Sequence, residues 1–312
     1  MFNKLPRNKF FLAPLAGIND PAFRLMCEDA GAGLTMTELT SIDYLYSEQE
    51  RALETIERAK DERCVGLQLF GKNPEKIKNA MHIVEDKFEF FDLNAGCPAN
   101  NIIGQGAGCE LMQKPTVLLK MLSEIIKNTN KPVTLKYRLG INTHKENFLE
   151  IGKQAEDIGV SMITLHARYA SQGYSGKANW TKIKDLKEKL NTPITGNGDI
   201  WQAEDGRKML DETKCDYTMI GRFAMGNPRA FTQLNDYYNK GEYTPTTDKD
   251  KLQDFLKYYE ETKKYNIHFE RIKIQAMQFT KGIRGGVKLR TEIAKAKNEE
   301  QIIKSVKAFT IK

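Results

Sequence analysis

The segment 92–101, DLNAGCPANN, places a cysteine between a glycine and a proline at the end of an apolar run. A thiol can act as an acid, a nucleophile or a metal ligand, but cysteine is also among the most often buried residue types. The glycine, the proline and the asparagines around Cys97 are typical of a turn. The pattern therefore favours a thiol that a loop presents to a ligand, with a packed side chain as the alternative.

Polar side chains also interrupt or end several other apolar segments. Burying such groups without partners is costly, so we expect them to converge on a ligand. They are Glu38, Gln68, Asn94, Lys136, Arg138, His166, Arg168, Asn197, Asp199 and Arg222. A lysine such as Lys136, inside an apolar strand, needs an anion or an electron-rich partner. Two uses of it are open, a charge beside a flavin and a Schiff-base amine.

Two glycine-rich segments, TGNGDI at 195–200 and IGRFAMGNP at 220–228, end the last two apolar runs. Glycine lets backbone N–H groups approach an anion closely, and Arg222 adds a rigid fork of donors. We expect a phosphate site where these segments meet. Two ordinary glycine turns are the alternative.

Eight apolar, β-rich runs hold these residues, and helical patterns separate the runs. They lie at 10–17, 34–39, 64–70, 90–96, 132–140, 162–167, 193–200 and 217–222. In one of the helical patterns, Asn73 is predicted to cap a helix that begins at Pro74. The fold class predicted is α/β, a (β/α)8 TIM barrel over residues 1–240, with an open doubly wound sheet as the alternative. A barrel would place the polar residues together at the carboxyl ends of its strands.

The segment 240–250 is polar and turn-rich, and it reads as a linker to a small helical domain over 248–312. Residues 289–309 continue in one helical register. The segment 248–312 holds 16 Lys and Arg against 9 Asp and Glu, which accounts for the whole formal net charge of +7. A basic appendage on a neutral body suggests a polyanionic partner such as nucleic acid. A lysine-rich helical domain without such a partner is the alternative.

The composition, 40% hydrophobic and 29% charged, is typical of a globular protein. No apolar run reaches the roughly 20 residues of a membrane span. The first residues lack the pattern of a secretory signal, so we expect a cytoplasmic protein. The five cysteines are far apart and have no histidine at zinc-like spacing, which predicts neither disulfides nor a metal site. The oligomeric state stays open, and a monomer is compatible with the sequence.

An ordered set of motifs resembles those of the tRNA-dihydrouridine synthases. The motifs are APLAGINDPAFR (13–24), LQLFG (67–71), LNAGCPANNIIGQGAGCELM (93–112), LKYRLG (135–140), LHARYASQGYSGKANW (165–180), ITGNGDI (194–200), MIGRFAMGNP (219–228) and MQFTKGIRGGVKLRTEI (277–293). The resemblance implies an FMN-binding barrel that reduces the 5,6 double bond of uridines in tRNA. It further implies NADPH or NADH as the electron donor and a tRNA-binding helical tail.

The resemblance also implies a role for individual residues. Flavin contacts would come from Pro14, Leu15, Ala16, Gln68, Lys136, His166, Asn197, Gly198, Asp199, Gly221 and Arg222. Asn94 and Arg168 would face the uridine. In the basic tail, the candidates for contacts with tRNA phosphates are Lys281, Arg284, Lys288 and Arg290.

Reduction of uracil needs a hydride at carbon 6 and a proton at carbon 5. A free thiol keeps its proton at neutral pH, because its pKa is about 8.5. We therefore interpret Cys97 as the general acid. Three other readings are a flavin enzyme for free pyrimidines or dihydroorotate, an RNA-binding barrel without catalysis, and a Schiff-base aldolase that uses Lys136.

Overall fold

The computed structural model describes residues 6–48, 50–265 and 267–310. Eight parallel strands form one sheet in which each strand from the second to the seventh pairs with the next along the chain, and the first pairs with the eighth. Their bounds are β1 Phe10–Leu12, β2 Thr35–Ser41, β3 Val65–Phe70, β4 Phe90–Ala95, β5 Val133–Arg138, β6 Met162–His166, β7 Ile194–Asn197 and β8 Tyr217–Ile220. Backbone hydrogen bonds from Gly33 to Phe10 and from Leu12 to Leu34 close the remaining gap beside β2. The predicted TIM barrel is confirmed.

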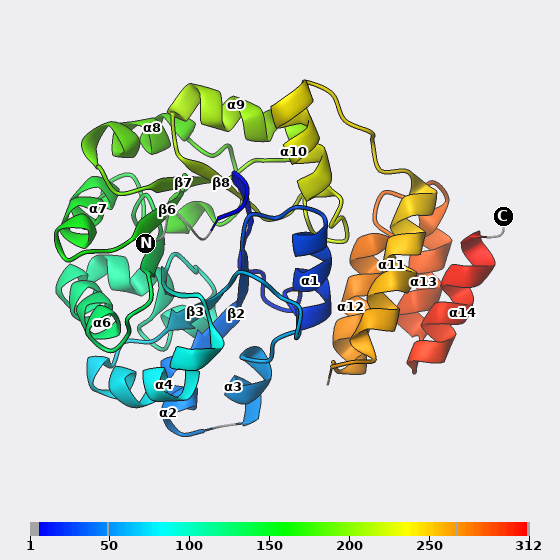
Figure 1. The fold of residues 1–312 in the computed structure, drawn as a ribbon, viewed down its shortest axis with the longest axis horizontal. Helices are drawn as coiled ribbons and strands as arrows, with labels where there is room; N and C mark the ends of the chain where they lie inside the picture. Colours follow the sequence, from blue (N-terminus) through cyan, green and yellow to red (C-terminus); the bar gives the residue numbers. More distant parts are fainter. Residues whose placement is uncertain (1–5, 49, 266, 311–312) are drawn as a thin grey trace.

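Helices surround this barrel (Figure 1). They are α1 Pro21–Asp29, α2 Ile42–Tyr46, α3 Glu50–Thr55, α4 Ile77–Val84, α5 Asn100–Ile103, α6 Pro115–Lys127, α7 Phe148–Asp157, α8 Trp180–Lys189, α9 Ala203–Thr213 and α10 Ala230–Lys240, with short 3-10 turns at Pro74–Lys76, Glu85–Lys87, Gly108–Gln113 and Ala170–Gln172. Asn73 does precede the turn that begins at Pro74, as predicted, but its side chain forms no capping hydrogen bond and donates to Asp43.

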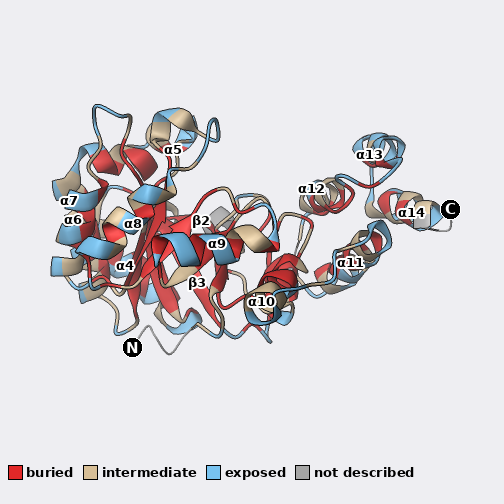
Figure 2. Ribbon diagram, turned by 90° about the horizontal axis from the view of Figure 1, so that it is seen from above, coloured by how far each residue is buried: buried red, intermediate tan, exposed pale blue. Residues whose placement is uncertain are grey.

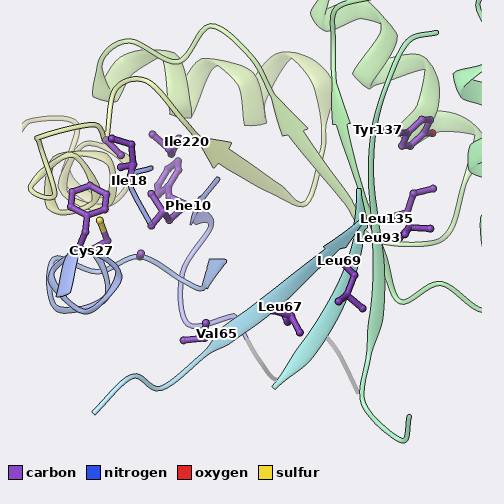
Figure 3. Packing of buried hydrophobic residues seen from close by; sticks show 14 of the residues in the cluster. Phe10, Ile18, Cys27, Val65, Leu67, Leu69, Leu93, Leu135, Tyr137 and Ile220 are labelled. Atoms are coloured by element: carbon purple, nitrogen blue, oxygen red, sulfur yellow. The ribbon is translucent and has the colours of Figure 1, made fainter. Parts of the chain in front are cut away.

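The strands alternate between an apolar outer face and a mixed inner face. Outward residues such as Leu67, Leu93 and Leu135 belong to the core between sheet and helices (Figure 3). The neighbouring residues along each strand therefore point into the barrel, since side chains alternate along a strand. Toward the amino ends of the strands the inward residues are apolar, among them Phe11, Leu34, Met36, Phe90 and Met162. At the carboxyl ends they are polar.

Four further helices follow the segment 241–247 and pack beside α1 and α10 (Figure 1). They are α11 Asp248–Thr262, α12 Phe269–Phe279, α13 Gly286–Lys295 and α14 Glu299–Thr310. Thr247 caps α11 by accepting the backbone N–H of Asp250. The single helical register predicted for 289–309 is interrupted, because Ala296 takes an extended conformation and ends α13.

Buried polar contacts join these helices to the barrel. The Tyr258 hydroxyl donates to Asp20 at 2.8 Å, and the Gln275 amide donates to the Ile18 carbonyl at 2.8 Å. Packing is close as well: a Cβ on Gly226 would lie within 2.5 Å of the backbone of Gln278. The helical tail is therefore seated firmly against the start of the barrel.

We predict that Tyr258→Phe weakens this contact. Burial raises the pKa of Asp20 to about 6, so its carboxyl depends on the donors around it. Loss of the Tyr258 hydroxyl should lower the free energy of unfolding by about 1–3 kcal/mol. Urea denaturation at constant pH measures the change. Tyr44→Phe is the matched control, because the Tyr44 hydroxyl has no hydrogen-bond partner among the described residues. Equal losses in both variants would contradict the role of the Tyr258 contact.

Candidate active site

A cavity of about 420 Å³ opens at the carboxyl ends of the strands. Fourteen of the residues predicted from the sequence line it: Pro14, Leu15, Ala16, Gln68, Asn94, Cys97, Lys136, Arg138, His166, Asn197, Gly198, Asp199, Gly221 and Arg222. Tyr174 and Met225 line it too, although they were not predicted. Each of these two lies inside one of the quoted motifs, which was the available signal.

The loop after β4 presents Cys97 to this cavity. Cys97 is half-buried, whereas the other four cysteines are buried. The Asn94 side-chain oxygen accepts the backbone N–H groups of Cys97 at 2.9 Å and Gly96 at 3.1 Å. From the other side, Arg138 donates to the Gly96 carbonyl at 2.9 Å. The turn is therefore fixed by two side chains from neighbouring strands.

Cationic groups dominate one wall of the cavity. Lys136 donates to Asn197 at 3.2 Å, and no carboxylate in the described ranges forms an ion pair with it. Burial, together with the nearby Arg138, lowers the pKa of Lys136 to about 8. Burial and the charge of Lys136 also hold the pKa of His166 well below its usual range. His166 is thus neutral near pH 7, and the wall suits an anionic or electron-rich ligand.

The ends of β7 and β8 form a cluster of anion donors. Backbone N–H groups of Gly198, Gly221 and Arg222 donate to no acceptor in the described part of the chain. Gly198 has a φ of +123°, and a Cβ there would lie 2.8 Å from Ala178. The Arg222 guanidinium lies 4.1 Å from the ring of Trp201, which holds it at the rim. Such a set of donors suits an anion such as phosphate.

Asp199 aligns two arginines behind this cluster. Its carboxylate accepts from Arg168 at 2.7 Å and 2.9 Å, from Arg222 at 3.2 Å, and from the Ala178 backbone at 2.7 Å. Arg168 also donates to the carbonyl of Gly176 and does not line the cavity. The structure thus places Arg168 in the wall rather than facing a ligand. Its predicted contact with uridine stays a prediction.

The four predicted tail residues lie away from the cavity, around the turn between α12 and α13. Lys281, Arg284 and Lys288 are exposed. Arg290 is half-buried and donates to the Thr280 carbonyl at 2.7 Å. Figure 2 shows α13 as one of the more exposed helices. The three exposed cations are therefore free to meet a polyanion, while Arg290 also braces the turn.

Two further findings concern the described residues only. They include no cluster of three or more histidine, cysteine or acidic side chains that could hold a metal ion. None of their helices combines the length and apolar character that crossing a membrane requires.

Comparison with known proteins assigns the family. Residues 11–311 match the dihydrouridine synthase (Dus) family. The chain belongs to the dihydrouridine synthase family. It is 37% identical to the tRNA-dihydrouridine synthase B of Pasteurella multocida over 235 residues. The aligned region covers 75% of this chain and 71% of that protein. It is 35% identical over 240 residues to the tRNA-dihydrouridine synthase B of Escherichia coli K12, with 77% and 75% covered.

Solved structures resemble this dihydrouridine synthase in fold. A 6-hydroxypseudooxynicotine amine oxidase from Pseudomonas geniculata N1 aligns with a TM-score of 0.58 at 12% identity, over 81% of this chain and 48% of that one. A histamine dehydrogenase from Rhizobium sp. 4-9 aligns with a TM-score of 0.52 at 13% identity, over 81% and 49%. At these identities the likeness concerns the fold alone.

We predict that iodoacetamide modifies Cys97 first in this dihydrouridine synthase. Burial raises the pKa of Cys64 and of Cys109 to about 12, and both are shielded from solvent. Alkylation of Cys97 should be at least about tenfold faster than that of any other thiol, because thiol reactivity follows exposure and thiolate content. Peptide mass spectrometry after short exposure measures it. Preferential labelling of a buried cysteine would contradict this site geometry.

Proposed function

We propose that this dihydrouridine synthase reduces the 5,6 double bond of uridines in tRNA, with FMN as its flavin and NADPH, or NADH, as the electron donor. The overall change consumes one uridine, one reduced nicotinamide and one proton. The observation that carries the proposal is the position of Cys97, on a loop held by Asn94 at the edge of the cavity. The same cavity has a cationic wall and a cluster of unpaired N–H donors. The printed names of the two relatives, tRNA-dihydrouridine synthase B, support the same substrate.

The residues of the cavity fit FMN. Gly198, Gly221 and Arg222 offer unpaired donors to a phosphate, and Lys136 offers a charge to the electron-rich part of a flavin ring. Pro14, Leu15 and Ala16 would line that ring, and His166 and Asn197 would contact the ribityl chain. The volume lies within the range of cofactor pockets. When bound and reduced, FMN supplies the hydride.

Cys97 supplies the proton in this proposal. Adding a hydride to carbon 6 of uracil leaves carbon 5 electron-rich, so an acid is needed beside carbon 5. The Cys97 thiol would transfer its proton to carbon 5, and the resulting thiolate would regain a proton from solvent at the open side of the cavity. Arg138, fixed by the carbonyls of Gly96, Tyr169 and Gly173, adds positive charge near the uracil oxygens.

The basic tail separates this function from reduction of a free pyrimidine or dihydroorotate. A small substrate would need only the cavity, whereas a tRNA must also be held by its phosphates. Lys281, Arg284 and Lys288 are exposed at one turn of the tail. The target uridine must leave the RNA stack to reach the cavity, as base-modifying enzymes require.

Cys97→Ala tests the acid. We expect the variant to keep its flavin and to oxidise NADPH, but to form dihydrouridine at least about 100-fold more slowly, since a general acid contributes about 10²–10⁴-fold. Mass spectrometry of digested tRNA measures the product, and absorbance measures flavin and nicotinamide. Cys64→Ala, at a buried thiol outside the cavity, is the control. A normal product rate in Cys97→Ala would exclude the acid role.

Paired replacement of Lys281 and Lys288 by alanine tests the tRNA surface. We expect weaker tRNA binding and a less steep dependence of affinity on salt, by roughly 0.7–0.9 in the logarithmic slope for each lost phosphate contact. Arg290 is left unchanged because it braces Thr280. Replacing Lys184 and Lys208, on the outer helices α8 and α9, is the control. A gel-shift series over several salt concentrations decides the matter, and an unchanged affinity and slope would remove the tail from RNA binding.

A further inference from the structure

A chain of buried polar side chains runs from β5 to the loop after β4 that presents Cys97. Its members are Thr134, Asp92, Gln68 and Asn94, and their exposed fractions are 0%, 0%, 0% and 6%. The strand register places Gln68 beside Asp92 and Asp92 beside Thr134 in one layer of the barrel. Apolar side chains fill this kind of position in the layer below. A buried carboxyl group is costly there, so its presence calls for a reason.

The hydrogen bonds along this chain are short and complete. Asp92 accepts from the Thr134 hydroxyl at 2.5 Å and from the Gln68 amide nitrogen at 2.7 Å. The Gln68 oxygen accepts from the Asn94 amide nitrogen at 2.9 Å. The Asn94 oxygen in turn accepts the backbone N–H of Cys97 at 2.9 Å. Five residues from β5, β4, β3 and the loop are thus linked without a gap.

The acceptor at position 92 sets the direction of every later bond. An ionised carboxylate can only accept, so Gln68 must turn its NH2 group toward Asp92. The Gln68 oxygen then faces Asn94, so Asn94 must donate from its own NH2 group. Only the Asn94 oxygen is left for the N–H groups of the Cys97 turn. Reversing either amide would place two donors or two acceptors face to face.

We propose that Asp92 is a positioning residue, which orients Gln68 and Asn94 and thereby holds Cys97 at the cavity. The importance of that position for proton transfer rests on the function proposed above. Burial raises the pKa of Asp92 to about 6, against the opposing effect of Thr134 and Gln68, so the group is an ionised acceptor at pH 8. Asp92 does not line the cavity, and it acts only through its neighbours.

Three variants test the direction of this chain in the flavin-bound protein. Asp92→Leu removes the acceptor. Asp92→Asn keeps an acceptor for Gln68, namely the new amide oxygen. Its NH2 group can donate to the Thr134 hydroxyl, because a hydroxyl also accepts hydrogen bonds. Thr134→Val removes one donor to Asp92 and leaves the bond to Gln68, so it controls for a change in the same layer.

The expected results separate positioning from stability. In Asp92→Leu, kcat for dihydrouridine formation should fall by about tenfold or more, with KM for tRNA within about twofold, because small displacements of a reacting group are costly. Alkylation of Cys97 by iodoacetamide should change by about threefold or more, since its turn loses an anchor. Asp92→Asn should restore both values to within about threefold of wild type, and Thr134→Val should match it.

Flavin content and melting temperature are measured for every variant. Should Asp92→Leu not fold with its flavin, Asp92→Ala takes its place, because it likewise removes the acceptor and adds no bulk to the layer. Wild-type kcat and alkylation in a folded Leu or Ala variant would overturn the proposal. So would a loss in Asp92→Asn as large as that in Asp92→Leu. If the wild-type protein forms no dihydrouridine, the proposed function is wrong. The positioning role of Asp92 is still tested in that case, because alkylation reports the position of Cys97.

Discussion

A closed eight-stranded barrel has an interior that must be filled, and how this one is filled determines its chemistry. Apolar residues such as Phe11, Phe90 and Met162 occupy the amino-terminal layer and make a dry floor. Above that floor the inward positions carry amides, a carboxyl and a lysine. Because water is largely excluded from the barrel interior, each donor there needs an acceptor from the protein or from a ligand. The polar layer therefore divides into groups that satisfy one another and groups left for a bound molecule.

The two kinds of group lie on different sides of the barrel. On the β3–β5 side, Asp92, Gln68 and Asn94 satisfy one another and fix a loop. On the β7–β8 side, backbone N–H groups stay unpaired, and the rim carries Arg222. The β3–β5 side therefore fixes the position of the loop, whereas the β7–β8 side leaves donors available to a ligand. Lys136, on β5 and bonded to Asn197 at the end of β7, stands between them.

Strand periodicity and turn chemistry made much of this predictable. The eight apolar runs gave eight strands, and the glycine-rich ends of the last two gave the anion cluster. Hydrogen-bond direction was out of reach, because the orientation of Asn94 depends on Asp92 through Gln68, a side chain on the neighbouring strand. Arg168 shows the same limit: only tertiary structure reveals that Asp199 draws its guanidinium into the wall. Asn73 stands at the predicted position before Pro74, but only the tertiary structure shows that its side chain bonds to the distant Asp43 and does not cap the turn.

The helical tail contacts the barrel beside the loop that would line a flavin. Glu38, in the middle of β2, pairs with Arg271 of α12 and also accepts the backbone N–H of Gly17 at 2.9 Å. Gly17 directly follows Pro14, Leu15 and Ala16. One carboxylate thus joins the tail to the wall of the cavity, and Gln275 reaches the Ile18 carbonyl a few residues on. A tail tied so closely to that loop cannot shift without disturbing the cavity, so an RNA held by the tail meets the cavity in a fixed relation. If the tail binds the RNA as proposed above, the same contacts that anchor the tail would limit which uridines of a rigid tRNA can reach Cys97.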